Sequence, residues 1–173
     1  MTEPPPRRPA RVRKLLEPMI RHGVDFVMVG GLAGTLHGSS VPTFDLDLAY
    51  ARDRANLERL AAALREIGVS LRGAPADLPF QLDAETLANG ANFTFETPLG
   101  DLDVLGDVGG MKRYDGLRQR SSVVDVYGLP VRVASVDDLI SMKRAANRPK
   151  DQLMLEELIV IAEEERKTGD GGD

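Results

Sequence analysis

Two aspartates separated by one apolar residue are the feature of this sequence that most clearly points to chemistry. They lie in the segment Phe44-Asp45-Leu46-Asp47-Leu48. If this segment forms a β-strand, Asp45 and Asp47 project to the same face, because successive side chains of a strand alternate. Two ionised carboxylates on one face repel each other, and burying either without compensation is unfavourable. We therefore expect a cation between them, and a hard divalent ion with oxygen ligands is the simplest candidate.

A glycine doublet, Gly30–Gly31, precedes the aspartates and directly follows the apolar run from Phe26 to Val29. Such a short run is typical of a strand buried on both faces. The segment from Leu32 to Leu36 is long enough for one or two helical turns. Glycine permits close approach of a ligand, and a helix start after such a turn suits an anion such as a phosphate. The alternative is a tight turn that needs small residues only for packing.

A third carboxylate of the same kind is Asp103, which stands between Leu102 and Val104. Apolar and polar residues alternate from Ala91 to Glu96 and from Asp101 to Leu105, and the turn Thr97-Pro98-Leu99-Gly100 lies between. This pattern predicts a hairpin whose second strand carries Asp103. Asp101 shares the face of Asp103 but adjoins the turn, and we interpret it as solvated.

The remaining patterns predict elements that surround these strands. Gly68 should end one helix, Ser135 should cap another, and Pro18 should kink a third or force it to restart. The predicted helices cover 12–20, 54–67, 111–117, 136–144 and about 149 into the 160s, a strand begins near 69, and a second hairpin covers 121–127 and 129–133.

Basic residues gather where the last helix begins. Lys150 and Asp151 lie in its first turn, where an aspartate suits the helix dipole and a lysine does not. Either this lysine meets an anion, or it is an ordinary solvated side chain. Lys143 and Arg148 lie nearby in the sequence and are further candidates for anion contacts.

Composition restricts the kinds of site that are possible. Of the 173 residues, 42% are hydrophobic and 28% are charged, which is the composition of a globular protein. The net charge of −5 differs from the basic character of a non-specific nucleic-acid binder. With no cysteine and two histidines, a metal must be held by carboxylates, which favours magnesium, manganese or calcium. We interpret His37 as structural.

The length predicts one domain, which we place at residues 10–162 between disordered tails at 1–9 and 163–173. The first residues contain no apolar signal-peptide core, and no segment has the roughly 20 apolar residues needed to cross a bilayer. We therefore expect a cytoplasmic protein with no membrane partner.

The order of these signals resembles the DNA polymerase β-like nucleotidyltransferase superfamily. Its pattern is an apolar strand ending in two small residues, then a carboxylate pair, then a lone carboxylate, which here are Gly30–Gly31, Asp45-Leu46-Asp47 and Leu102-Asp103-Val104. The segments VGGLAGTLHGSSVPTFDLDL and DDLISMKRAANRPKDQLMLEEL resemble the small bacterial members, including abortive-infection and toxin–antitoxin types. The resemblance implies an α+β fold with a mixed central β-sheet, flanking helices and C-terminal helices.

The resemblance also implies an activity and a site. The protein would transfer a nucleoside monophosphate from a nucleoside triphosphate, ATP for example, to a hydroxyl group of RNA such as tRNA, of a protein or of a small molecule, and an antitoxin protein could be its partner. Asp45, Asp47 and Asp103 would hold Mg²⁺ or Mn²⁺ and be catalytic. The nucleotide would contact Gly30, Gly31, Thr43, Lys143, Arg148, Lys150 and Asp151, the last by orienting a basic side chain.

Two departures from the family pattern bear on activity. Leu32 stands where many relatives have a serine, and Val41 stands where small relatives carry an arginine. These differences favour a second hypothesis, a non-catalytic module of the same fold that binds a nucleotide or a partner protein, whereas the three aspartates favour an active enzyme. A third hypothesis, a metal-dependent phosphohydrolase of another fold, is disfavoured by the lack of a histidine cluster and by the glycines that precede the aspartate pair.

Overall fold

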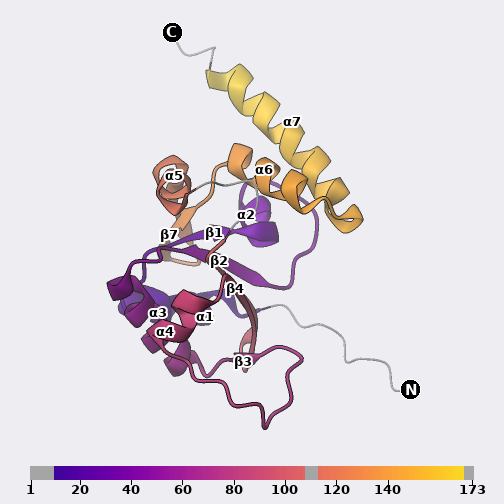
Figure 1. Ribbon diagram of the computed structural model, residues 1–173. Coiled ribbons are helices and arrows are strands. Elements are labelled where there is room, and N and C mark those ends of the chain that lie inside the picture. The colour runs from indigo at the N-terminus through magenta and orange to yellow at the C-terminus, as the bar shows by residue number, and fades with distance from the viewer. Residues whose placement is uncertain (1–9, 108–112, 170–173) are drawn as a thin grey trace, which may run out of the picture.

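A computed structural model describes residues 10–107 and 113–169 of the chain as an α+β fold built on one seven-stranded sheet. The predicted mixed sheet with flanking and C-terminal helices is confirmed (Figure 1). The strands are β1 (Phe26–Val29), β2 (Leu46–Tyr50), β3 (Ser70–Leu71), β4 (Asn92–Thr97), β5 (Gly100–Leu105), β6 (Ser122–Val126) and β7 (Leu129–Val133). The helices are α1 (Val12–Arg21), α2 (Gly30–Leu36), α3 (Arg54–Ile67), α4 (Ala84–Asn89), α5 (Tyr114–Arg120), α6 (Val136–Ala146), η1 (Pro149–Asp151) and α7 (Gln152–Gly169).

The order of strands in the sheet is β3-β4-β5-β2-β1-β7-β6. β2 is central: it pairs with β1 in antiparallel and with β5 in parallel fashion. Its register places Asp47 opposite Val29 on one neighbour and opposite Asp103 on the other. Asp47, Asp103 and the strand that leads into the glycine doublet therefore meet on adjacent strands, whereas Asp45 lies just before β2 and not on the strand predicted for it.

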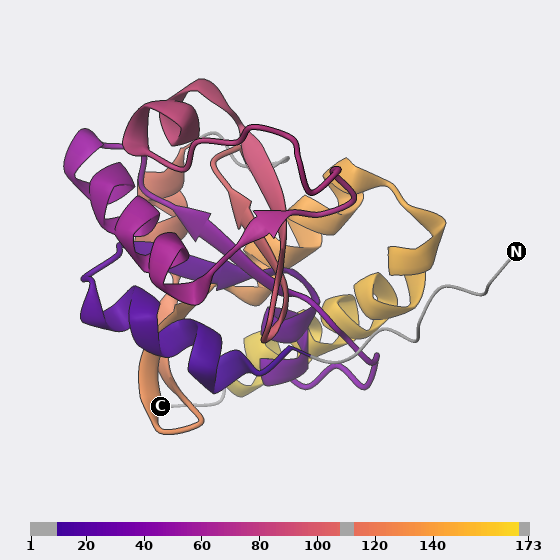
Figure 2. The same cartoon turned by 90° about the horizontal axis from the view of Figure 1, so that it is seen from below.

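Helices cover both faces of the sheet. α1, α3 and α4 lie on one face, and α2, α5, α6 and α7 lie on the other, as Figure 1 shows. Figure 2 shows α1 (indigo) and α3 (purple) side by side, where they pack together. Along β2, Leu46 and Leu48 are fully or almost fully buried in the core, so the alternate residue Asp47 projects toward α2 and α6.

Local signals placed most elements correctly. α3 ends at Gly68, whose φ of 81° is left-handed, and the Ser135 hydroxyl accepts a hydrogen bond from the Asp138 amide at the start of α6. Both predicted hairpins are present as β4–β5 and β6–β7. α5 begins at Tyr114, and the first two residues of the helix predicted there lie outside the described residues.

Several boundaries differ from the predictions. α1 passes through Pro18 as one helix, so of the two predicted effects of Pro18, a kink or a restart, the restart does not occur. β2 begins at Leu46 and continues to Tyr50, because β1 and β5 both supply pairing partners beyond Leu48. α7 continues to Gly169, so residues 163–169 are helical where a disordered tail was predicted; glutamate, arginine and lysine there are good helix formers. No helix in the described residues is long and apolar enough to cross a membrane.

Candidate functional site

One cavity of about 330 Å³ is lined by all the residues predicted to form the site, and we call it the aspartate cavity. It lies where β1, β2 and β5 face α2, the end of α6 and the start of α7. The predicted residues in its lining are Gly30, Gly31, Thr43, Asp45, Asp47, Asp103, Lys143, Arg148, Lys150 and Asp151. Residues separated by more than a hundred positions in the sequence thus share one surface.

The carboxylates of Asp47 and Asp103 lie side by side on β2 and β5, whose register pairs these two residues. Burial, the charge and hydrogen bond of Asp103, and the charge of Asp45 together raise the pKa of Asp47 from 3.8 to about 7. Lys143 acts in the opposite direction and lowers it. Burial and the neighbouring carboxylates thus disfavour the ionised form of Asp47, and a bound cation would favour it.

The glycine doublet is required by close packing against the strand residues. Gly30 has a φ of 75°, and a Cβ placed there would lie 2.1 Å from Oδ2 of Asp47. A Cβ at Gly31 would lie 2.5 Å from Cγ2 of Thr43. Both steric contacts involve residues of the cavity, so the doublet brings the start of α2 directly against the aspartates. Packing therefore does require glycine at both positions, as in the tight-turn alternative, and the residues packed against the doublet, Asp47 and Thr43, belong to the aspartate cavity.

The basic side of the cavity is organised by Asp151. Its carboxylate accepts from Lys143 Nζ at 3.1 Å and from Arg148 Nε at 2.6 Å. Lys143 and Asp151 are mostly buried, with 11% and 13% of their side chains exposed, whereas Lys150 is exposed at the rim. Hydrogen bonds and the two cations lower the pKa of Asp151 despite its partial burial. Asp151 thus fixes two basic groups at the cavity, as its predicted orienting role requires.

A loop wall completes the cavity on the side of Thr43. Glu157 of α7 accepts from the Ser39 hydroxyl at 2.7 Å, from the Ser40 amide at 2.9 Å, and from the Ser40 hydroxyl. These bonds lower the pKa of Glu157 and tie the loop after α2 to α7. The Nε2 N–H of His37 donates to the Ala134 carbonyl at 2.7 Å, in agreement with a structural role.

The sequence interpretation missed Arg72, which follows the edge strand β3. Its Nη2 donates to Oδ1 of Asp103 at 2.7 Å and to the Phe95 carbonyl at 2.8 Å, and its Nε lies 3.4 Å from Oδ2 of Asp101. Asp101 is therefore ion-paired and not simply solvated as interpreted. Partial burial lowers the pKa of Arg72, but the carboxylates of Asp103, Asp101 and Asp45 raise it more. No local pattern marks Arg72, because its position depends on the pairing of β3 with β4.

Oxygen donors of the aspartate cavity suit Mg²⁺ or Mn²⁺, and the crowding that raises the pKa of Asp47 is relieved by a cation. Within the described part of the chain, no three His, Asp or Glu side chains stand in an arrangement ready to hold one ion. The contact of Asp103 with Arg72 gives a physical reason, since one of its oxygens is already engaged. The donor set fits a divalent ion, and its assignment to Asp45, Asp47 and Asp103 stays a prediction.

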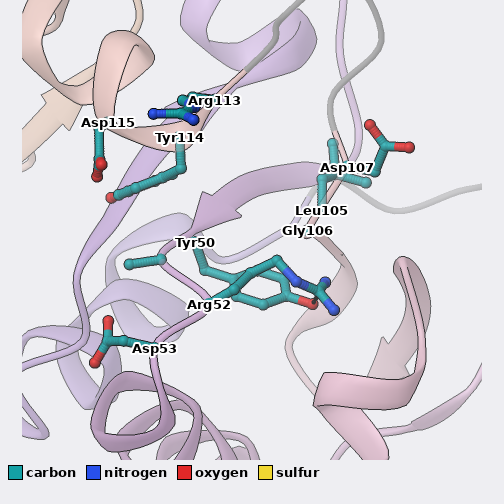
Figure 3. A pocket seen from close by; sticks show the side chains of 10 residues that line it. Tyr50, Arg52, Asp53, Leu105, Gly106, Asp107, Arg113, Tyr114 and Asp115 are labelled. Carbon is teal, nitrogen blue, oxygen red and sulfur yellow. Dashed lines mark hydrogen bonds between the residues drawn. The ribbon is translucent and has the colours of Figure 1, made fainter.

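Two further cavities adjoin β5. The first, about 400 Å³ and here called the α6 cavity, shares Gly30, Asp47, Asp103, Lys143 and Arg148 with the aspartate cavity. It extends along β5 past Leu105 to Asp107 and is closed by Met142 and the end of α6. The second, the Tyr50 cavity, has about 470 Å³ and lies at the far ends of β2 and β5, where Arg52 lies beside the Tyr50 ring (Figure 3).

Comparison with solved structures identifies the fold. LnuA, a lincosamide antibiotic adenylyltransferase solved with lincomycin bound, gives a TM-score of 0.58 with 12% identity over 87% of this chain and 95% of that chain. ANT(2'')-Ia, solved with adenylyl-2''-tobramycin, gives 0.51 with 17% identity over 91% and 95%. A Thermotoga maritima protein described as a nucleotidyltransferase gives 0.52 with 16% identity over 86% and 89%.

These likenesses show that the chain has the nucleotidyltransferase fold, as the sequence resemblance implied. No protein-family model matches the sequence, and a search of curated proteins finds no match.

Proposed function

We propose that the protein is a nucleotidyltransferase that moves a nucleoside monophosphate from a nucleoside triphosphate to a hydroxyl group with the aid of Mg²⁺ or Mn²⁺. The observation that carries the proposal is the aspartate cavity, where three aspartates, the glycine doublet and the basic residues around Asp151 meet. Its occurrence on a nucleotidyltransferase fold gives independent support.

The residues have separate tasks in this proposal. Asp45, Asp47 and Asp103 would hold the divalent ion, which when bound neutralises charge on the attacking and leaving oxygens. Amides of Gly30 and Gly31 would contact the triphosphate, with Thr43 and Lys150 at the rim of the same cavity. Lys143 and Arg148, held by Asp151, would add positive charge for the leaving pyrophosphate.

The arrangement of the cavities indicates the side from which the acceptor arrives. In phosphoryl transfer the attacking and leaving oxygens are roughly in line through phosphorus. If pyrophosphate leaves beside the glycine doublet, the acceptor hydroxyl would approach through the part of the α6 cavity that the aspartate cavity does not share, along Leu105, Asp107 and Met142. Asp103 lines both cavities and would assist deprotonation of that hydroxyl.

The α6 cavity favours a small-molecule acceptor. Its volume of about 400 Å³ suits a compact ligand, and its lining combines apolar Leu139 and Met142 with polar Asn92 and Asp107. LnuA and ANT(2'')-Ia, which share the fold, are described with a lincosamide and with tobramycin, both small molecules. Transfer to RNA or to a protein is the alternative, and the toxin–antitoxin role implied by the sequence resemblance stays a prediction.

A second candidate function is a non-catalytic module that binds a nucleotide. Leu32 and Val41 replace polar residues that the family pattern places beside the phosphates, and Arg72 engages Asp103. In that case the aspartate cavity would bind a nucleotide without transfer.

The deciding experiment is an assay of pyrophosphate release from labelled nucleoside triphosphates with Mg²⁺ or Mn²⁺. Lincomycin, tobramycin, other small hydroxyl compounds, total RNA and cell protein serve as separate acceptors. We expect acceptor-dependent release that Asp47→Ala abolishes, a loss of at least about 10³-fold, while the circular dichroism spectrum is retained. Nucleotide binding without release for any acceptor would favour the non-catalytic module, and release unchanged by Asp47→Ala would contradict the assigned site.

A further inference from the structure

Arg72 introduces a positive charge among the carboxylates of the site. Its guanidinium contacts Asp103 at 2.7 Å and lies 3.4 Å from Asp101, and 23% of its side chain is exposed. Asp103 in turn lies against Asp47 on the neighbouring strand. The positive charge expected beside the aspartates is thus supplied at Asp103 by Arg72, a residue of the chain itself.

The contacts of Arg72 hold it in place independently of the aspartates. Its backbone amide donates to the Thr94 carbonyl at 3.0 Å, and its Nη2 donates to the Phe95 carbonyl at 2.8 Å. Both carbonyls belong to β4, the strand between β3 and β5. Because the guanidinium is anchored on β4, it presents a fixed charge to Asp103 and does not swing freely as a surface side chain would.

We propose that Arg72 is a positioning residue that acts as an internal counter-ion for the aspartate cluster. It holds Asp103 and balances its charge when no divalent ion is bound, and it opposes the binding of that ion. The inference rests on the proposed function only in that the aspartates bind a divalent ion. It adds a residue from an edge strand to a site otherwise built from β1, β2, β5 and the C-terminal helices.

Opposite changes in two measurable quantities distinguish this role from that of a structural strap. Without Arg72, the carboxylates repel one another in the ion-free protein, so its melting temperature should fall. The same loss of positive charge strengthens the field at the ion, so the affinity for Mn²⁺ should rise. A strap that merely ties β3 to the sheet would lower stability and leave Mn²⁺ binding unchanged or weaker.

The test uses Arg72→Met in the full chain, with Mn²⁺ alone as the probe and no nucleotide. We expect Mn²⁺ to bind about tenfold more tightly, because removal of a unit charge beside an ion ligand is worth about 1.4 kcal/mol at protein-like screening. The melting temperature in EDTA should fall. Arg72→Lys keeps the charge without the fork and should give intermediate values for both quantities, and it serves if Arg72→Met does not fold.

Arg52→Met is the matched control. Arg52 also anchors a guanidinium on backbone carbonyls, those of Ala88 and Gly90, but it lies in the Tyr50 cavity (Figure 3). Its loss should lower the melting temperature and leave Mn²⁺ affinity as in the wild type. An equal effect of Arg52→Met and Arg72→Met on Mn²⁺ binding would overturn the inference.

A double-mutant cycle in EDTA separates this inference from the proposed function. Arg72→Met should lower the melting temperature much less in an Asp103→Asn background than in the wild type, and additive losses would overturn the counter-ion role. If wild-type protein binds no Mn²⁺ but Arg72→Met does, the proposed metal-dependent activity fails while the inference stands. Unchanged or weaker Mn²⁺ binding by Arg72→Met overturns the inference even if nucleotidyl transfer is observed.

Discussion

The aspartate cavity and the Tyr50 cavity lie at different ends of the same strands, β2 and β5, and their charged side chains have different surroundings. In the aspartate cavity Asp47 is crowded by Asp103 and Asp45, which together with burial raises its pKa to about 7. In the Tyr50 cavity two charged residues are held by the fold: Arg52 donates to two carbonyls, and Asp53 caps α3 by accepting from the Asn56 amide.

Volume does not explain the difference, since the Tyr50 cavity is larger, at about 470 Å³ against 330 Å³. The two cavities differ in that the ionised form of Asp47 is disfavoured by burial and by neighbouring carboxylates, whereas Arg52 and Asp53 of the Tyr50 cavity have hydrogen-bond partners. A buried conflict lowers stability, and proteins keep such conflicts where a ligand relieves them. Equivalent substitutions inside and outside the aspartate cavity test this difference.

After Asp47→Ala, the largest effect is expected from Gly30→Ala. A Cβ at this position lies 2.1 Å from Oδ2 of Asp47, so the carboxylate or the start of α2 must move. We expect nucleotidyl transfer to fall about 100-fold, because displacement of a catalytic group by about an ångström costs that much. Initial rates of pyrophosphate release under saturating Mn²⁺ and nucleotide would measure it.

Gly68→Ala provides the control for backbone strain. Gly68 has a φ of 81°, close to the 75° of Gly30, but no atom lies within 4 Å of a Cβ built there. Its substitution should lower stability by about 1 kcal/mol through the left-handed backbone alone and leave the transfer rate unchanged. Equal rates for the two variants would mean that the contact of Gly30 with Asp47 has no functional weight.

The parts of the site that the sequence predicts are those in which side-chain type and spacing act locally. Alternation along residues 44–48 and 101–105 placed Asp47 and Asp103 on one face, and the glycine doublet marked the end of β1. Capping chemistry located Ser135 and Gly68. These features follow from strand period and backbone conformation, which depend on neighbours in the sequence.

A second, smaller effect concerns the pH dependence of stability. The pKa of Asp47 is raised from 3.8 to about 7, so between these values the folded protein holds a proton that the unfolded chain has released. The unfolded state therefore gains relative stability as pH rises through this window. We expect Asp47→Asn, compared with the wild type in EDTA, to be equally stable near pH 4 and more stable at pH 8.

Asp53→Asn makes the same chemical change in the Tyr50 cavity. Asparagine caps a helix as well as aspartate does, so the hydrogen bond from the Asn56 amide is retained. At pH 8 its free energy of unfolding, measured by urea denaturation, should not exceed that of the wild type. A stability gain at pH 8 from Asp53→Asn as large as that from Asp47→Asn would remove the distinction between the two cavities.

What the sequence does not predict arises from contacts between distant segments. Arg72 reaches Asp103 because β3 pairs with β4, and β4 with β5. Glu157 binds the loop at Ser39 and Ser40 because α7 returns across the end of α2. The residues next to Arg72 and Glu157 in the sequence do not indicate these contacts, and from the sequence alone each would be interpreted as an ordinary charged surface residue.

The smallest effect is expected from the loop wall of the aspartate cavity, and adjacent glutamates allow it to be isolated. Glu157 accepts three hydrogen bonds from Ser39 and Ser40, whereas its neighbour Glu156 is exposed and accepts from Gln152 at 3.3 Å. Glu157→Gln keeps the shape but removes the charge that strengthens these bonds, so the loop carrying Thr43 should loosen. We expect the KM for the nucleotide to rise about threefold with kcat nearly unchanged, since a loosened binding wall weakens ground-state and transition-state binding alike.

Glu156→Gln should change neither constant. If both variants behave like the wild type, the loop wall does not contribute to nucleotide binding, and the difference between the two cavities resides in the aspartates and their cations alone.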